Sequence, residues 1–208
     1  MTGIILAGGK SRRMGTDKAC LPWQDGTLLT ATVDKLLLVC HEVIIVGPYR
    51  AIARKVHWTK DRYVGKGPLA GLQAGLEAAS SNSKSALVLP CDMPTVPVQV
   101  LEALVLRSQC QAVDMVIPVH SGGSEPLCAW YSIENCLPVI QTLLETGHSR
   151  LTDILSRVRV DQVEVGNLFP GIAVEKIFAN LNSPLDYESA KQMTVNDLKT
   201  QDEEMGGE

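Results

Sequence analysis

Short aliphatic runs alternate with helix-length amphipathic stretches along most of this chain. The aliphatic runs are Gly3 to Leu6, Val43 to Val46, Ala86 to Leu89 and Met115 to Val119. The stretches with helical spacing between them are Leu28 to Cys40, Pro68 to Ala79 and Pro97 to Arg107. Continuous apolar strands separated by helices favour βαβ units around a sheet buried on both faces. The pattern predicts a three-layer, Rossmann-like α/β domain with a mostly parallel central sheet.

The pattern is looser after Gly122-Gly123. We expect strands at Leu127 to Tyr131, Val160 to Val165 and Ile177 to Leu181. We expect helices at Ile133 to Glu145, Leu151 to Val158 and Pro184 to Met193. Residues 194–208 turn polar and acidic, so we expect a disordered tail after one domain that spans residues 1–193.

Charge and composition exclude several classes of protein. The 19 basic residues are outnumbered by 23 acidic ones, whereas a protein that coats nucleic acid is usually basic. The apolar runs fall short of the roughly 18 residues that a membrane span needs, and no secretory signal is evident. The six cysteines form no C-x-x-C pair, and the histidines are scattered. We therefore expect a cytoplasmic protein with reduced thiols and no zinc, nucleic acid or membrane partner.

The first candidate motif extends from Leu6-Ala7-Gly8-Gly9 to Lys18, where a strand ends in two glycines. Its backbone N–H groups, with Arg13 and Lys18, suit a phosphate chain. It differs from a Walker A loop, because Thr16 follows Gly15 where lysine is required. A glycine-rich surface turn with solvated cations is the alternative.

The second motif, Gly65-Lys66-Gly67-Pro68-Leu69-Ala70-Gly71, is a glycine turn into a helix. No strand is evident before it, so it is not read as a dinucleotide-binding fingerprint. The free N–H groups of the helix N-terminus suit a nucleotide. Close helix packing through Gly71 and Gly75 explains the same glycines equally well.

The third and fourth motifs are polar segments next to prolines. Asp92, in Cys91-Asp92-Met93-Pro94, follows a buried strand, where a carboxylate suits Mg²⁺ beside a polyphosphate. Capping the next helix is its alternative role. In Asn180-Leu181-Asn182-Ser183-Pro184, Asn182 or Ser183 is expected to cap the last helix, and lining of an acceptor site is an additional role.

Taken together and in this order, the four motifs resemble the molybdenum cofactor guanylyltransferase family. Glu125-Pro126-Leu127, followed by Ala129 and Tyr131, is similar to its mid-chain segment. The first motif alone is similar to the wider nucleotidyltransferase superfamily. The second and third motifs narrow the resemblance to the guanylyltransferase family. Gly47-Pro48 departs from the family pattern, because some relatives have a nucleotide-contacting asparagine there.

The resemblance implies transfer of GMP from GTP to the phosphate of molybdenum-bound molybdopterin, with Mg²⁺ as cofactor and pyrophosphate as the second product. Molybdoenzymes or their chaperones are its expected protein partners. The implied nucleotide-binding residues are Leu6, Ala7, Gly8, Gly9, Lys18, Asp61 and Asp92. Asp92 is the implied metal ligand, and Asn180 and Asn182 belong to the acceptor side.

An acceptor phosphate is already ionised near neutral pH, so the reaction needs no general base. This agrees with a sequence that has no evident His–carboxylate pair. Catalysis would then depend on alignment and on charge neutralisation by Lys18, Arg13 and Asp92. The alternatives are a cytidylyltransferase, another nucleotidyltransferase with a different phosphate acceptor, and a nucleotide-binding paralogue without activity.

Overall fold

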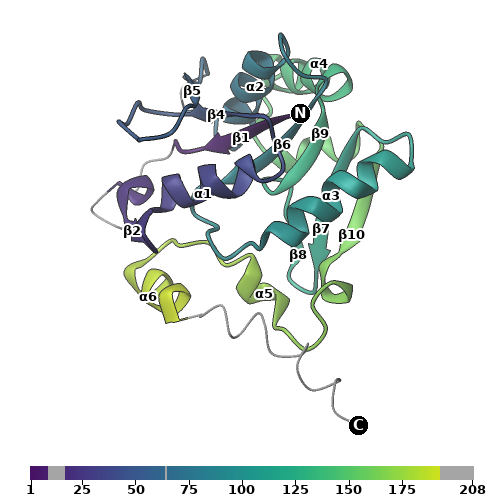
Figure 1. Ribbon diagram of the computed structural model, residues 1–208. Helices are drawn as coiled ribbons and strands as arrows, with labels where there is room; N and C mark the ends of the chain where they lie inside the picture. Colours follow the sequence, from purple (N-terminus) through teal and green to yellow (C-terminus); the bar gives the residue numbers. More distant parts are fainter. Residues whose placement is uncertain (9–16, 64, 193–208) are drawn as a thin grey trace.

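The aliphatic run at the N-terminus is a central strand, with a parallel neighbour on each side (Figure 1). The computed structural model describes residues 1–8, 17–63 and 65–192. Its strands are β1 (Thr2–Leu6), β2 (Pro22–Trp23), β3 (Gly26–Thr27), β4 (Glu42–Val46), β5 (His57–Thr59), β6 (Ser85–Pro90), β7 (Met115–His120), β8 (Gly123–Ser124), β9 (Ala129–Ser132) and β10 (Val160–Glu164). Its α-helices are α1 (Leu28–Leu37), α2 (Pro68–Ala79), α3 (Val98–Cys110), α4 (Ile133–Glu145), α5 (Val174–Ile177) and α6 (Pro184–Gln192). The 3₁₀ helices are η1 (Lys18–Cys20), η2 (Leu151–Ile154) and η3 (Val165–Asn167).

The main sheet has the order β10-β7-β9-β6-β1-β4-β5, with β8 paired to β7. Strand β9 lies between β6 and β7 and is antiparallel to both, so β6 and β7 run in the same direction. The path from β1 to β7 otherwise follows parallel strands joined by helices, and the predicted α/β class is confirmed.

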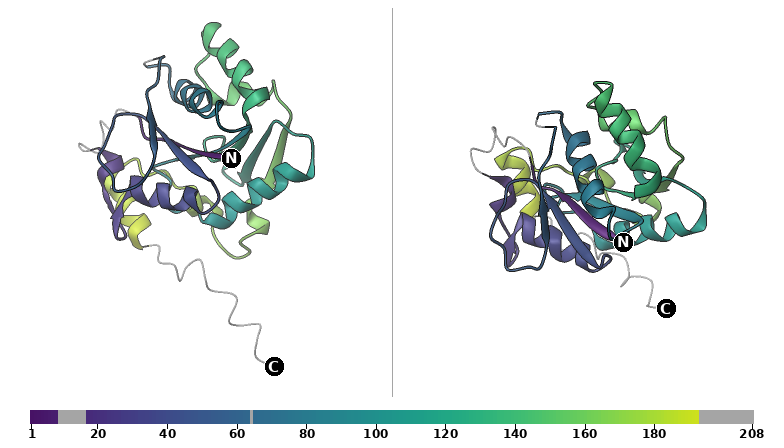
Figure 2. Two further views of the ribbon diagram at one scale, coloured as in Figure 1. Left: turned by 45° about the horizontal axis from the view of Figure 1, so that its top comes forward. Right: turned by 90° about the horizontal axis from the view of Figure 1, so that it is seen from above.

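Helices cover both faces of the sheet (Figure 2). Because side chains alternate along a strand, Ile4 packs with α2 and α4, whereas Ile5 packs with α1 and α3. Both isoleucines are fully buried. The continuous aliphatic character of β1 thus reflects two buried faces.

Most predicted elements lie within a few residues of those observed, and α2 and α4 have the predicted bounds. The predicted helix Leu151 to Val158 is only the short η2. The strand predicted at Ile177 to Leu181 is wrong, because Ile177 ends α5. The backbone N–H of Leu181 donates instead to the carbonyl of Asp92, at 3.0 Å. Residues 178–182 form an irregular segment, here called the C-terminal strap.

The strand β5 and the hairpin of β2 and β3 were not expected from the sequence. β5 pairs with β4, so the interpretation that no strand precedes the second glycine motif is wrong. The motif is still no dinucleotide fingerprint, because the turn at Gly67 does not follow β5 directly.

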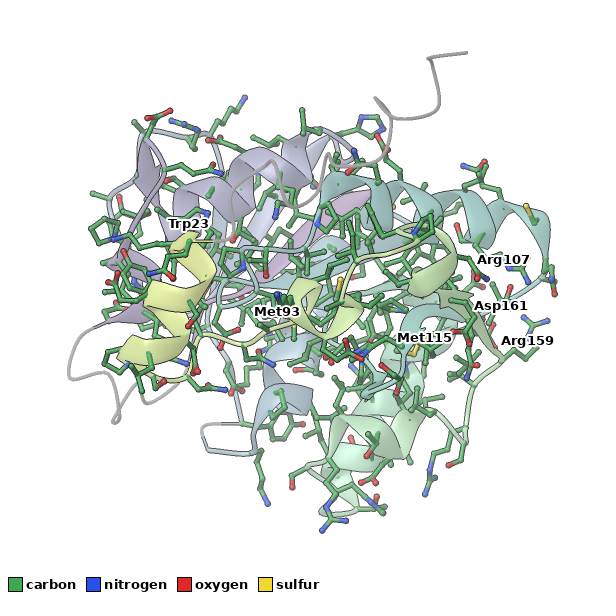
Figure 3. All side chains as sticks on the ribbon, turned by 90° about the horizontal axis from the view of Figure 1, so that it is seen from below. Trp23, Met93, Arg107, Met115, Arg159 and Asp161 are labelled. Atoms are coloured by element: carbon green, nitrogen blue, oxygen red, sulfur yellow. The ribbon has the colours of Figure 1, made fainter. Side chains whose placement is uncertain are left out.

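The outer strand β10 is held by ion pairs. Arg107 on α3 pairs with Asp161 at 2.6 Å, and both lie near Arg159 (Figure 3). No helix in the described residues has the length and apolarity needed to cross a membrane. The predicted acidic tail, residues 194–208, lies outside the described residues, as does Met193 at the expected end of the last helix.

Candidate active site

Several of the predicted site residues lie at the position in the sheet where the strand order reverses. From β1, helix α1 leads to β4 on one side, and α2 later leads to β6 on the other. Such a switch point leaves a crevice at the carboxyl ends of the strands, which is the usual ligand site of open α/β sheets. Ala7 and Gly8 follow β1 at this edge, and Asp92 follows β6.

Lys18, Asp92 and Asn182 meet at this edge. The Lys18 ammonium lies 3.5 Å from Oδ2 of Asp92 and donates to Oδ1 of Asn182 at 3.0 Å. The side chains of Lys18 and Asp92 are 15% and 27% exposed, so both are accessible to a ligand. An ammonium beside a carboxylate and an amide is a site for a polyphosphate and its counter-ion.

Hydrogen bonds hold the backbone of Asp92 and of the segment that follows it. The Leu181 hydrogen bond fixes its carbonyl, while the ammonium of Lys35 on α1 donates to the carbonyls of Pro94, at 2.7 Å, and Val96. Burial lowers the pKa of Lys35 to about 8. The alternative role of Asp92 as a helix cap is wrong, because Pro97 is the N-cap of α3.

Lys18 is positioned by the residue before it. Asp17 caps η1 by accepting from the N–H of Ala19 at 3.2 Å. The Arg50 guanidinium donates to both oxygens of Asp17, at 2.6 and 2.9 Å, and to the carbonyl of Ala7 at 3.3 Å. Hydrogen bonds from Arg50 lower the pKa of Asp17, so its carboxylate stays ionised.

Sequence reasoning missed both Arg50 and Lys35. The sequence signal for Arg50 is its position shortly after Gly47-Pro48, where a predicted strand ends. Gly47 has φ of +149°, and a Cβ there would lie 2.9 Å from the carbonyl carbon of Ala7. The close approach of the chain after β1 to the chain after β4 therefore requires glycine at position 47.

Asn182 and Ser183 have different roles. Ser183 caps α6, since its Oγ accepts from the N–H of Asp186 at 3.2 Å. Asp186 in turn accepts from the N–H groups of Asn182 and Ser183, which is a reciprocal cap. The amide side chain of Asn182 is thus left to contact Lys18. Asn180 is exposed on the strap and contributes its carbonyl to the N–H of Asn182.

The glycine turn before α2 is at the same edge, because it follows β5. Gly67 is the N-cap, with φ of +74° and no side-chain hydrogen bond, so no capping side chain satisfies the first N–H groups of α2. Gly75 has a packing role, because a Cβ there would lie 2.6 Å from a methyl group of Ile4. Asp61 accepts from the N–H of Tyr63 at 2.7 Å and, within the described residues, makes no hydrogen bond or ion pair with Lys18 or Asp92.

The predicted site residues of the first motif lie partly outside the described part of the chain. Gly9 and Arg13 lie in residues 9–16, outside the described part of the chain. Leu6 is half-buried, Ala7 is buried and Gly8 is exposed. Within the described residues, no group of three or more histidine, cysteine or acidic side chains is arranged to hold a metal ion.

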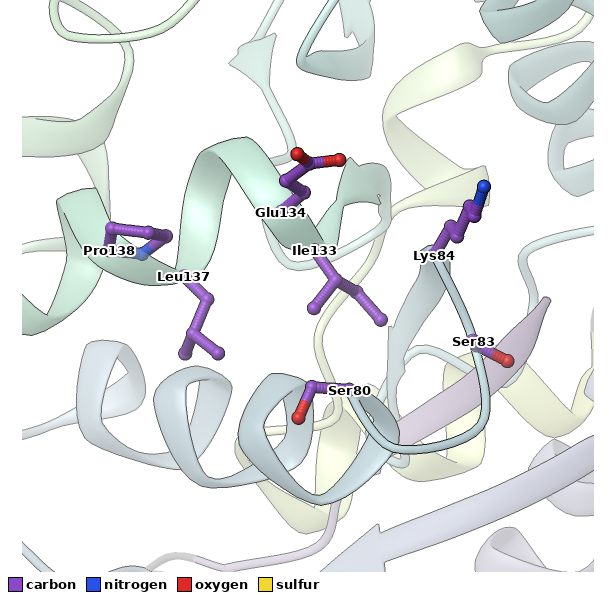
Figure 4. A pocket seen from close by; sticks show the side chains of 7 residues that line it. All are labelled: Ser80, Ser83, Lys84, Ile133, Glu134, Leu137 and Pro138. Atoms are coloured by element: carbon purple, nitrogen blue, oxygen red, sulfur yellow. The ribbon is translucent and has the colours of Figure 1, made fainter.

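A surface cavity of about 240 Å³ lies away from this site (Figure 4). It is lined by Ser80, Ser83, Lys84, Ile133, Glu134, Leu137 and Pro138. These residues surround the start of β6, whereas Asp92 follows its end. The cavity therefore belongs to the opposite edge of the sheet.

Comparison with known proteins agrees with this geometry. Residues 3–163 match the family model described as a MobA-like NTP transferase domain. The chain is 34% identical to a probable molybdenum cofactor guanylyltransferase of Pelotomaculum thermopropionicum, over 94% of each chain. It is 30% identical to the molybdenum cofactor guanylyltransferase of Desulfosudis oleivorans, over 92% of this chain and 94% of that one.

A solved structure gives the same result. Molybdopterin-guanine dinucleotide biosynthesis protein A from Archaeoglobus fulgidus has a TM-score of 0.75 and 25% identity to this chain, and the match covers 92% of this chain and 97% of that one. The fold, the gathered motifs and these matches agree: this chain belongs to the molybdenum cofactor guanylyltransferase family.

Proposed function

We propose that this protein transfers GMP from GTP to the phosphate of molybdenum-bound molybdopterin, releasing pyrophosphate. The observation that carries the proposal is the meeting of Lys18, Asp92 and Asn182 at the switch point of the sheet. The named guanylyltransferases that resemble this chain over most of its length support the same donor and acceptor.

In this proposal, catalysis depends on the alignment of the substrates and on the neutralisation of phosphate charge. The second pKa of a phosphate monoester is near 6, so the acceptor oxygen attacks the α-phosphorus of GTP without a general base. The Lys18 ammonium would neutralise charge on the phosphates as the bond to pyrophosphate breaks. Asn182 holds that ammonium in place through its amide oxygen.

The expectation that the chain has no His–carboxylate pair is wrong. His120 lies 3.3 Å from Glu125, and His148 lies 2.9 Å from Asp153. Neither pair contacts Lys18 or Asp92 in the described residues, so the proposed reaction uses neither as a base.

The residues present fit Mg²⁺ bound mainly through the substrate. Mg²⁺ in such sites takes one or two carboxylates together with phosphate oxygens and water, and Asp92 supplies one accessible carboxylate. Bound there, the ion would add positive charge next to the phosphates. We propose Asp92 as its protein ligand.

We also propose a cytoplasmic location. All six cysteines are unpaired, and four of them are buried. Burial raises the pKa of Cys91 and Cys128 to about 12, which keeps these thiols protonated. Free thiols in this number are typical of a reducing compartment.

The function is tested with purified protein, Mg²⁺ and molybdopterin cofactor released from a molybdoenzyme. Each of the four nucleoside triphosphates is supplied separately, and the product is identified by its mass. We expect a GMP-bearing dinucleotide from GTP alone. A CMP-bearing product would overturn the choice of base. GTP binding without any product would indicate another acceptor or a binding protein without activity.

A further inference from the structure

A histidine and a glutamate that the proposed reaction leaves unused lie at the same edge of the sheet as Asp92. His120 is the last residue of β7, which runs in the direction of β6. Its side chain is only 6% exposed, and that of Glu125 is 22% exposed. The two are joined between Nε2 and Oε1 at 3.3 Å.

The hydrogen bonds of His120 fix how its ring is protonated. The backbone N–H of Gly122 donates to Nδ1 at 3.1 Å, so Nδ1 is the acceptor nitrogen. In the neutral ring Nε2 then carries the hydrogen and donates it to Glu125. The ring also stacks on Phe178, with the centroids 4.9 Å apart and the planes 7° from parallel.

Glu125 is therefore a carboxylate held in one orientation. Its own N–H donates to the carbonyl of Pro118 at 3.1 Å, which fixes its backbone to β7. A carboxylate has about four acceptor positions, and His120 occupies one of them. The buried imidazole of His120 fixes the direction of the remaining acceptor positions of Glu125, and these positions are partly open to solvent.

The C-terminal strap connects this pair to the proposed reaction centre. Phe178 stacks on His120, Leu181 bonds to Asp92, and Asn182 bonds to Lys18. The strap covers four residue steps from Phe178 to Asn182, and four residues of extended chain span at most about 14 Å. Only β9 separates β6 from β7, so their ends lie about 10 Å apart across the sheet. A small-molecule substrate can therefore reach from the end of β6 to the end of β7.

We propose that Glu125, oriented by His120, binds the ring end of the acceptor while the acceptor's phosphate lies at Lys18 and Asp92. This rests on the proposed function. A pterin carries a ring N–H and a 2-amino group side by side, and a carboxylate accepts from such a pair in a bidentate manner. Guanine presents the same pair of donors. The end of β1 and the glycine turn before α2, whose backbone N–H groups suit the phosphates of the nucleotide, lie on the other side of β6, which favours the pterin.

The test variant is Glu125→Gln, which replaces one acceptor oxygen by an NH₂ group of similar size. Molybdopterin is varied at saturating GTP, and GTP binding is measured separately by calorimetry. We expect the KM for the acceptor to rise about 10- to 100-fold, because two charge-assisted hydrogen bonds are weakened. The kcat and the GTP Kd should change by less than about twofold.

Two further variants separate recognition from folding. Glu134→Gln makes the same substitution on α4, at the opposite edge of the sheet, and should leave the acceptor KM unchanged. His120→Phe keeps a ring to stack on Phe178 but removes the donor to Glu125. It should raise the acceptor KM by a smaller factor than Glu125→Gln does.

An acceptor KM within twofold of the wild-type value in Glu125→Gln overturns the proposal. A weaker GTP Kd with an unchanged acceptor KM also overturns it and assigns the carboxylate to guanine. If the wild-type protein makes no dinucleotide, the proposed function fails separately. Binding of free molybdopterin, followed by pterin fluorescence in wild type and Glu125→Gln, then still decides the role of Glu125.

Discussion

At the scale of single residues, the site consists of charged groups brought together from distant parts of the chain. Lys18 and Asp92 are 74 positions apart, and Lys18 and Asn182 are 164 apart. The motifs indicated that each residue has a chemical role. Their meeting could be anticipated only through a family resemblance, because no local spacing encodes it.

Removing either charge at the reaction centre should stop turnover. We expect Lys18→Ala and Asp92→Ala each to lower kcat by a factor of about 100 to 1,000, since each removes charge stabilisation from phosphoryl transfer. Both side chains are partly exposed, so thermal unfolding should change little. Steady-state kinetics and circular dichroism measure the two effects. Lys84→Ala, at the opposite edge of the sheet, is the control, and near wild-type kcat in either site variant would refute the assignment.

Arg50 should affect activity through Lys18. Arg50→Gln loses both hydrogen bonds to Asp17, so we expect kcat/KM to fall about 10- to 100-fold. Asp17→Asn should have a similar effect, and the double variant should lose little more. Arg54→Gln breaks a comparable bidentate pair with Asp34 on the surface and is the matched control. Equal kinetics for Arg50→Gln and Arg54→Gln would show that Arg50 does not position the site.

At the scale of elements, the sequence predicted those with strong internal periodicity. Helix α4 has the expected bounds, because its apolar positions repeat at helical spacing. The apolar residues of the C-terminal strap predict a strand, whereas the strap is irregular in the structure. Phe178 packs into the core beside α3, and Leu181 packs under α6. These long-range contacts, like those of Lys35 and Arg50, have no local signature.

The stability contributed by the contacts of Asp114 and Arg159, next to β7 and β10, should fall at acidic pH. Asp114 accepts from the side chain and the backbone of Arg159 and from Asn135, and these bonds lower its pKa to about 2. The unfolded chain binds the proton more readily, so the carboxylate stabilises the fold above about pH 4. That contribution, about 2 kcal/mol, disappears as the pH falls towards 2. Urea unfolding of wild type and Asp114→Asn should differ at pH 7 and converge near pH 2; a constant difference would contradict this account.

Lys35 should produce a dependence of the same sign at alkaline pH, because its folded pKa is also below the unfolded value. Its folded pKa of about 8 is below the ordinary 10.5, so the unfolded chain holds the proton more tightly between these values. Its contribution to stability therefore rises with pH across that window. The buried thiols act the other way, because burial raises their pKa to about 12. The informative quantity is the difference in unfolding free energy between wild type and Lys35→Met, which should grow from pH 8 to 10.5. A flat difference would show that the two carbonyls keep Lys35 protonated.

At the scale of the whole molecule, the nucleotide should stabilise the folded chain by mass action. At a GTP concentration of about 100 times Kd, the gain is about 2.7 kcal/mol, which raises the Tm of a chain this long by about 5 to 10 °C. Differential scanning calorimetry with and without GTP measures it. Lys18→Ala should lose most of the shift, whereas Lys84→Ala should keep it. An equal shift with every triphosphate would indicate that the phosphates alone are recognised.

The strap also determines when the site can exist during synthesis. Residues 1–120 leave the ribosome early, and they contain the neighbouring strands β5, β4, β1 and β6 together with Lys18 and Asp92, whereas β9, which joins β6 to β7, comes later. Asn182 and the N–H of Leu181 emerge only after nearly the entire domain has been made. A nascent chain can thus assemble much of its core while its reaction centre is still open on one side. The C-terminal strap completes the proposed site, so a chain that ends before it has a sheet but lacks the contacts of Leu181 and Asn182.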